Sequence, residues 1–180
     1  MKQNTIHANR GQALETAIEH TCAIYRSRGL GLIQKIATPM RQTGKTSGES
    51  RVWRERSTVD FIGVYKGIPV AFDAKETGID RYVLAALKAH QADFLADFTR
   101  AGGVGFVLAS FRHHSAAFAL APSWALACAD GLDAASIPIG LLRSATGPLG
   151  PFSIAPGSGC VPFDFGPAVE SFAEALHAAR

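Results

Sequence analysis

The stretch Thr58–Thr77 reads TVDFIGVYKGIPVAFDAKET, and it decides how the centre of the chain folds. Thr58–Tyr65 and Ile68–Ala74 are rich in β-branched and aromatic residues, and they flank Lys66-Gly67, which is a short hairpin signal. The pair is a weaker turn signal than Asn-Gly, but its glycine can adopt the positive φ that such a turn requires. The stretch therefore predicts two antiparallel strands joined by a two-residue loop.

A hairpin with this loop places Asp60 directly opposite Asp73, with Cβ atoms roughly 4.5–5.5 Å apart. Lys75 follows Asp73 by two residues and therefore points to the same face. Like charges in this position destabilise a sheet, and a divalent cation would neutralise them. Oxygen-only ligands favour Mg²⁺, with Mn²⁺ as a possible substitute, over zinc. The Lys75 ammonium could orient a water molecule or stabilise charge on a phosphate. A sheet edge with solvated charges is the alternative interpretation.

The set Asp60, Asp73-Ala74-Lys75 has the form D…(D/E)-x-K and resembles the metal centre of the PD-(D/E)xK nuclease superfamily. The wider run Asp60–Thr77 is similar to the signature of RecU-type Holliday junction resolvases, and so are Asn9-Arg10-Gly11 with Glu15, and His90-Gln91. The resemblance spans about residues 9–120. One departure is that this family usually has Glu where this chain has Asp73, which is shorter by one methylene. The superfamily accepts either carboxylate at this position, so whether the shorter side chain alters metal distance or metal preference stays open.

The resemblance implies a role for two further side chains. Glu15 lies at the edge of the apolar stripe of a helix predicted from about Gly11 to Arg28; by position alone it is a surface acid, and the resemblance makes it a support of the metal centre. Gln91 is the polar residue on the apolar stripe of a helix predicted from about Arg81 to Arg100, with Asp80 as a candidate N-cap. Gln91 either supports the carboxylate site or is a core glutamine with other partners. The expected catalytic residues are Asp60, Asp73, Lys75, Glu15 and Gln91, and the expected metal ligands are Asp60, Asp73 and Glu15.

The other elements complete a mixed sheet. Strands are predicted at residues 32–37, 103–110 and 115–121, and helices at 124–129 and 167–179. The Arg112-His113-His114 run falls on the turn between the second and third of these strands, where solvent-exposed histidines are expected. The fold class is therefore α/β (α+β), with a restriction-endonuclease-like mixed sheet flanked by helices, as the resemblance also implies.

Residues 38–57 form a polar, basic insertion with Trp53 among its arginines. The resemblance implies that this segment projects as a stalk into the centre of a four-way junction, where arginine and aromatic groups suit phosphate contact and base stacking. A mobile basic loop anchored by Trp53 is the alternative. The expected DNA-binding residues include Arg10 and Lys88 outside the insertion. Within it, the expected contacts are Arg41, Lys45, Arg51, Arg54 and Arg56.

Composition bounds the remaining possibilities. At 180 residues, 47% hydrophobic and 18% charged, the sequence predicts a single globular domain over residues 1–180, with 38–57 as an insertion. Its net charge of +3 is mild, so a polyanion partner is indicated by the local basic excess in the insertion and not by the total. Three distant cysteines make neither a disulfide framework nor a zinc motif. With no secretory signal and no membrane-length apolar run, a cytoplasmic location away from membranes is expected.

These features predict a Mg²⁺-dependent endodeoxyribonuclease that resolves Holliday junctions by paired symmetric cuts in DNA recombination and repair. Branched DNA would be its partner, and two symmetric cuts imply a homodimer. Two alternatives stay open: another PD-(D/E)xK nuclease of flap, repair or restriction type, and a DNA-binding module without catalysis. An enzyme or interaction domain unrelated to nucleic acids would show no salt-dependent DNA affinity.

Overall fold

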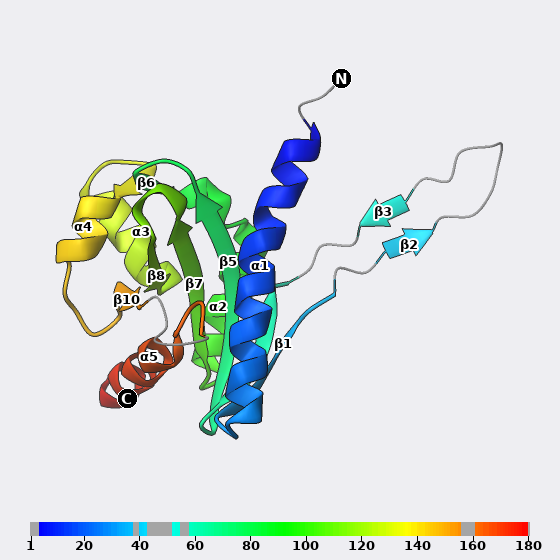
Figure 1. Cartoon of the computed structure of the whole chain (residues 1–180). Helices are drawn as coiled ribbons and strands as arrows, with labels where there is room; N and C mark the ends of the chain where they lie inside the picture. The colour runs from blue at the N-terminus through cyan, green and yellow to red at the C-terminus, as the bar shows by residue number, and fades with distance from the viewer. Residues whose placement is uncertain (1–3, 38–39, 43–51, 55–57, 156–160, 180) are drawn as a thin grey trace.

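The computed structural model describes residues 4–37, 40–42, 52–54, 58–155 and 161–179 (Figure 1). For residues 4–10, 40–42 and 52–54 it describes the backbone alone. Arg10, Arg41 and Arg54 therefore have a described backbone and no described side chain. Lys45, Arg51 and Arg56 lie outside the described residues, so their expected contacts with DNA stay predictions.

A six-stranded sheet forms the centre of the molecule, in the strand order β1-β4-β5-β7-β8-β10. Only β5 and β7 pair in parallel, and every other pair of neighbours is antiparallel, which confirms the predicted mixed sheet. The strands are β1 (Gly31–Lys35), β4 (Phe61–Tyr65), β5 (Ile68–Thr77), β7 (Val104–Phe111), β8 (Ala116–Leu120) and β10 (Phe152–Ile154).

The β4–β5 hairpin has the predicted register. Tyr65 pairs with Ile68 and Phe61 pairs with Phe72, so Lys66 and Gly67 alone form the loop. Both loop residues have positive φ, 46° and 81°, as a type I′ turn requires. This turn therefore fixes which residues of β4 and β5 lie side by side.

Helices cover both faces of the sheet (Figure 1). On one face, α1 (Asn4–Ser27) and α5 (Gly166–Ala178) bury a core that includes the stacked rings of Phe61, Phe72 and Phe106, whose centroids are 4.9 and 4.8 Å apart. On the other face, α2 (Ala89–Arg100) and α3 (Pro122–Gly131) pack on a second core. Residues of β5 alternate between these cores, so Asp73 shares the α2 face with Ala71.

Four short strands form two smaller sheets. β2 (Met40–Gln42) pairs with β3 (Val52–Arg54), and β6 (Arg81–Val83) pairs with β9 (Ser136–Pro138). The β2–β3 ribbon belongs to the insertion and is a sheet separate from the central one (Figure 1). That residues 38–57 are a projecting stalk on a single domain stays a prediction. The remaining short helices are η1 (Leu84–Ala86), η2 (Arg112–His114) and α4 (Ile139–Ser144).

Two predicted helix starts are wrong. The helix expected from Arg81 begins only at Ala89, with Lys88 as its N-cap, because residues 81–83 instead form β6 and hydrogen-bond to β9. Asp80 is accordingly no helix cap, and its carboxylate lies 2.6 Å from His114 Nε2. The first helix begins at Asn4 rather than at about Gly11, so it also includes residues 4–10. Within the described ranges, α1 and every other helix are too short or too polar to cross a membrane.

Candidate metal centre

Asp73 is the buried centre of the candidate site. Its side chain is fully buried on β5. Oδ1 accepts a 2.7 Å hydrogen bond from Gln91 Nε2. The ammonium group of Lys75 lies against Oδ2, which otherwise has no hydrogen bond of ordinary geometry among the described groups. Buried polar atoms are nearly always paired, so an under-satisfied carboxylate oxygen marks a place where a further electropositive ligand fits.

Asp60 lies beside Asp73, as the hairpin register predicts. It directly precedes β4, one step beyond the pair Phe61–Phe72. Its Oδ2 accepts a 2.9 Å hydrogen bond from the backbone N–H of Ala74, the residue after Asp73. The start of β4 and the second half of β5 thus bring two carboxylates together, one half-buried and one buried.

The surroundings raise the pKa of the Asp73 carboxyl to about 7. Burial is the largest cause, because it penalises the charged form, and the nearby charge of Asp60 is the next. Lys75 acts in the opposite direction and does not compensate fully. The pair of carboxylates therefore lacks positive charge, and a divalent cation with oxygen ligands matches this donor set.

Gln91 reaches the site from the first turn of α2. Its side chain is buried, with 8% exposed, and its Oε1 accepts a 3.1 Å bond from the backbone N–H of Lys88. Both ends of the amide are thus engaged, and the Nε2 donor is held towards Asp73. The amide finds its partner in the carboxylate site, one of the two interpretations left open by the sequence. The Lys88 side chain is exposed on the surface.

Glu15 is paired with Lys35 and not with the aspartates. Glu15 Oε2 lies 2.7 Å from Lys35 Nζ, and both side chains are more than two-thirds buried. Lys35 is two residues after Ile33 on β1, so both side chains lie on the face of the sheet that α1 covers. Lys35 therefore approaches from the face opposite to Asp73. The bond to Glu15 is the main cause that raises the Lys35 pKa, and the charge of Asp60 contributes. Within the described ranges no three His, Cys, Asp or Glu side chains form a metal cluster.

Lys35 is a basic residue near the carboxylate pair that sequence reasoning missed. It ends β1, and the next backbone N–H, of Ile36, bonds to the carbonyl of Asp60 at 2.7 Å. Its charge lies within influence of both Glu15 and Asp60. The signal was the alternation along Gly31–Lys35, which places this lysine on the same face as Ile33 and therefore towards α1.

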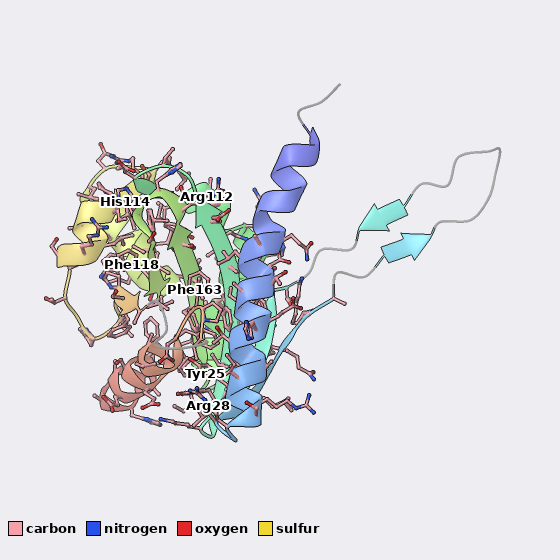
Figure 2. All side chains as sticks on the ribbon, viewed as in Figure 1. Tyr25, Arg28, Arg112, His114, Phe118 and Phe163 are labelled. Carbon is pink, nitrogen blue, oxygen red and sulfur yellow. The ribbon has the colours of Figure 1, made fainter. Side chains whose placement is uncertain are left out.

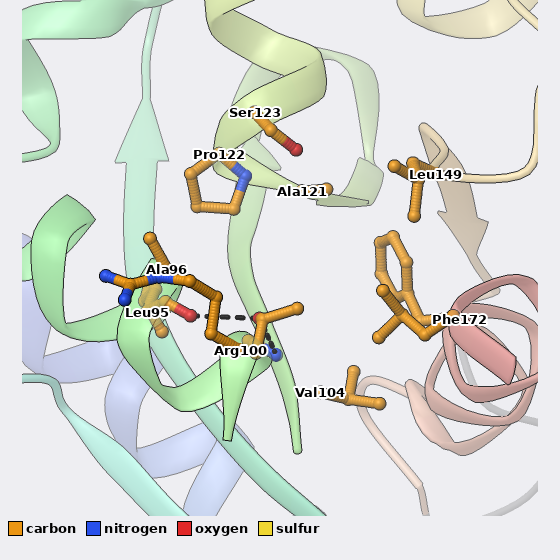
Figure 3. A pocket seen from close by; sticks show the side chains of 12 residues that line it. Leu95, Ala96, Arg100, Val104, Ala121, Pro122, Ser123, Leu149 and Phe172 are labelled. Carbon is orange, nitrogen blue, oxygen red and sulfur yellow. Dashed lines mark hydrogen bonds between the residues drawn. The ribbon is translucent and has the colours of Figure 1, made fainter. Parts of the chain in front are cut away.

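An apolar cavity of about 270 Å³ lies elsewhere, between α2, α5 and the N-terminal ends of β7 and α3 (Figure 3). Its wall includes Leu95, Phe172 and Leu149, and none of the residues around Asp73 lines it. Thr99 links this end of α2 to β7 through two hydrogen bonds (Figure 3). Its hydroxyl group donates one to the carbonyl of Leu95 and accepts the other from the backbone N–H of Gly105. Arg100 lines the cavity but no carboxylate does among the described residues, so it offers no ligand for a cation and the carboxylate pair is the better candidate site.

A mixed sheet covered by helices on both faces, with two aspartates and a lysine converging at one hairpin, defines the restriction-endonuclease-like class of nuclease folds. Within this class, the family model described as "RecU: Recombination protein U" matches residues 9–139. The chain belongs to the RecU family.

Curated relatives agree with this assignment. The chain is 39% identical over 101 residues to the Holliday junction resolvase RecU of Mycoplasmopsis pulmonis, which covers 56% of this chain and 62% of that protein. It is 32% identical over 127 residues to the protein of the same name from Ligilactobacillus salivarius, covering 66% and 60%. The matched region spans about three fifths of the length of these relatives.

Proposed function

We propose that this chain is a divalent-metal-dependent endodeoxyribonuclease that resolves Holliday junctions. The observation that carries the proposal is the convergence on Asp73 of a second carboxylate, an ammonium group and an oriented amide, from Asp60, Lys75 and Gln91. Membership of the RecU family, and the names of its relatives, support junction DNA as the substrate.

Asp60 and Asp73 would hold the cation, with Mg²⁺ the expected metal and Mn²⁺ a possible substitute. A bound cation supplies a water molecule of lowered pKa and neutralises charge on the scissile phosphate. Glu15 would assist only through rearrangement of its pair with Lys35, since the structure keeps it with that lysine. This makes Glu15 the weakest member of the proposed set.

The remaining side chains position the reacting groups. Lys75 places its ammonium at Asp73 Oδ2, where it would orient the attacking water or stabilise the charge that develops on the phosphate. Gln91 fixes the direction of Asp73 through Oδ1. The backbone N–H of Ala74 does the same for Asp60.

DNA binding is proposed for the basic residues of the insertion and for Arg10 and Lys88. β1 and β4 are the two strands from which the insertion leaves the sheet, and the carboxylate pair lies beside them. The segment 38–57 therefore starts and ends close to the carboxylate pair, as a stalk beside the cleaved strand would require. Binding through such contacts falls steeply with salt.

A homodimer would supply the two symmetric cuts. β1 is an end strand of the central sheet. Leu32 on β1 lies directly opposite Val64 on β4, and these two apolar side chains are 50% and 44% exposed. An apolar pair beside a free strand edge is a feature that proteins usually cover, and a second copy of the chain would cover it.

The test is incubation with a mobile four-way junction, with and without Mg²⁺, of the wild type and of Asp73→Ala. Symmetric nicked duplexes that form only with wild type and metal support the proposal. Equal cleavage of linear or flapped duplex would favour another nuclease of the same superfamily. Binding without cleavage by the wild type would favour a DNA-binding module, and absence of both would overturn every nucleic-acid function.

A further inference from the structure

Arg112 follows β7 and lies beside the end of β5, the neighbouring strand that carries Asp73. β5 and β7 run parallel, and Thr77, the last residue of β5, pairs with Phe111, the last residue of β7. Arg112 follows Phe111 and opens η2, so its side chain starts beside the end of β5 (Figure 2). The sequence had predicted only a turn with solvent-exposed histidines at this position.

The Arg112 guanidinium is held in one orientation by Glu76. Arg112 Nε lies 3.2 Å from Glu76 Oε1, and Nη2 lies 2.6 Å from Oε2, so the contact is bidentate. The glutamate side chain is 17% exposed and the arginine side chain 42% exposed. A guanidinium has five N–H donors, and two bonds leave the remainder available on its exposed side. Such a group is preorganised for a second planar or tetrahedral anion.

The position of Arg112 relates it to the site. Glu76 directly follows Lys75 on β5, so its side chain, and the guanidinium paired with it, leave the sheet on the face opposite to Lys75 and Asp73, which is the face of Lys35. Lys35, at the end of β1, lies on the other side of the carboxylate pair in the strand order β1-β4-β5-β7. Adjacent strands are roughly 4.8 Å apart. Asp73 pairs with Val107, five residues before Arg112, so a nucleic-acid strand that crosses Asp60 and Asp73 and continues towards the ends of β5 and β7 would reach Arg112 roughly 15 Å from the carboxylates.

We propose that Arg112 binds a backbone phosphate of the DNA strand, on the side of the cleavage site away from Lys35 and the insertion. Glu76 is its positioning residue. This inference rests on the proposed function, because it assumes that DNA crosses the carboxylate pair.

The test uses chains that bind DNA without cutting it. Asp73→Asn serves as the parent, and Arg112→Gln and Arg112→Lys are added to it. Arg100→Gln is the matched control, since Arg100 is an exposed arginine paired with Asp97 at the far end of α2. The affinity for a four-way junction is measured by fluorescence anisotropy at several NaCl concentrations in EDTA, and urea unfolding checks that each variant is folded.

Arg112→Gln is expected to weaken junction binding about three- to tenfold and to reduce the slope of log K against log salt by about one. Arg112→Lys should keep the slope, because it keeps the charge. It should lose part of the affinity, because an ammonium cannot form the paired hydrogen bonds of a guanidinium. Arg100→Gln should match the parent in both quantities.

The outcomes separate this inference from the proposed function. If Arg112→Gln matches the parent in affinity and slope while the wild type cleaves junctions, the guanidinium is only a surface ion pair and the inference is wrong. If the slope falls by one but the wild type does not cleave, the phosphate contact stands and the nuclease activity fails. If the parent and the wild type bind no DNA, both proposals fail.

Discussion

At the level of single residues, the groups around Asp73 shift its pKa in opposite directions. Burial and the Asp60 charge favour its protonated form, whereas Lys75 favours the carboxylate. Because the first two effects prevail, the folded chain without metal carries a carboxyl group that is costly to ionise. An oppositely charged ligand would relieve this cost. Functional sites often contain groups of this kind, which the rest of the fold must tolerate.

The pKa of Asp73 makes stability depend on pH. With a folded pKa of about 7 and an ordinary value of 3.8 in the unfolded chain, the folded state binds more protons between these values. The free energy of unfolding in EDTA should therefore fall as pH rises from about 4 to 7, by at most about 4 kcal/mol from this group. Asp73→Asn removes the ionisation and keeps an acceptor for Gln91, so it should stabilise the chain at pH 8 more than at pH 5.

Urea unfolding of both chains at a series of pH values measures this difference. Asp97→Asn is the control, since Asp97 is exposed on α2. A stability difference between wild type and Asp73→Asn that stays constant with pH would show that Asp73 does not titrate in this range.

Gln91 should control metal affinity more than stability. Gln91→Leu removes the donor to Asp73 Oδ1 and leaves the carboxylate free to rotate. Loss of such a supporting hydrogen bond typically lowers metal affinity about 10–100-fold. Calorimetric titration with Mg²⁺ measures the change, and Gln12→Leu, at an exposed position of α1, is the control. Unchanged Mg²⁺ affinity in Gln91→Leu would mean that the amide does not serve the metal centre.

At the level of elements, the two ends of the segment 38–57 meet at one place on the central sheet. The backbone N–H of Ile36 bonds to the carbonyl of Asp60 at 2.7 Å, so the chain leaves and re-enters the sheet at one place. Replacing residues 38–57 by a short Gly-Ser linker should therefore leave the thermal midpoint nearly unchanged. If the insertion enters the junction, the shortened chain should lose its preference for four-way junctions over linear duplex. Competition binding with both DNAs measures the preference, and a shortened chain that still selects junctions would contradict the stalk interpretation.

Sequence predicted the elements that depend on local signals. The β4–β5 register followed from a two-residue turn, and from this register came the neighbouring positions of Asp60 and Asp73. β6 could not be found in this way, since its pairing with β9 depends on a segment far along the chain. Glu15 could not be assigned from local signals either, because its partner Lys35 belongs to another element. A metal ion would have to displace Lys35 in order to bind the Glu15 carboxylate.

At the level of the whole molecule, two different surfaces would make the two kinds of contact. Basic groups would contact DNA, and an apolar pair would contact a second copy of the chain. The net charge of +3 is small, so long-range attraction to DNA would depend on the local basic groups of the insertion and of the strand ends. The apolar pair Leu32 and Val64 lies on strands next to that insertion. A second copy that covers this pair would bring two insertions and two carboxylate sites to the same assembly.

The dimer interface can be tested on this surface. Leu32→Glu combined with Val64→Glu places two like charges opposite each other at the expected interface, and should convert a dimer into a monomer in sedimentation velocity. Because each monomer holds one carboxylate site, the double variant should nick junctions singly instead of producing paired symmetric cuts. Leu126→Glu is the control, since Leu126 is 53% exposed on α3 and lies away from β1. A double variant that remains dimeric and still makes paired cuts would place the interface elsewhere, whereas a wild type that is monomeric on junction DNA would contradict the symmetric mechanism.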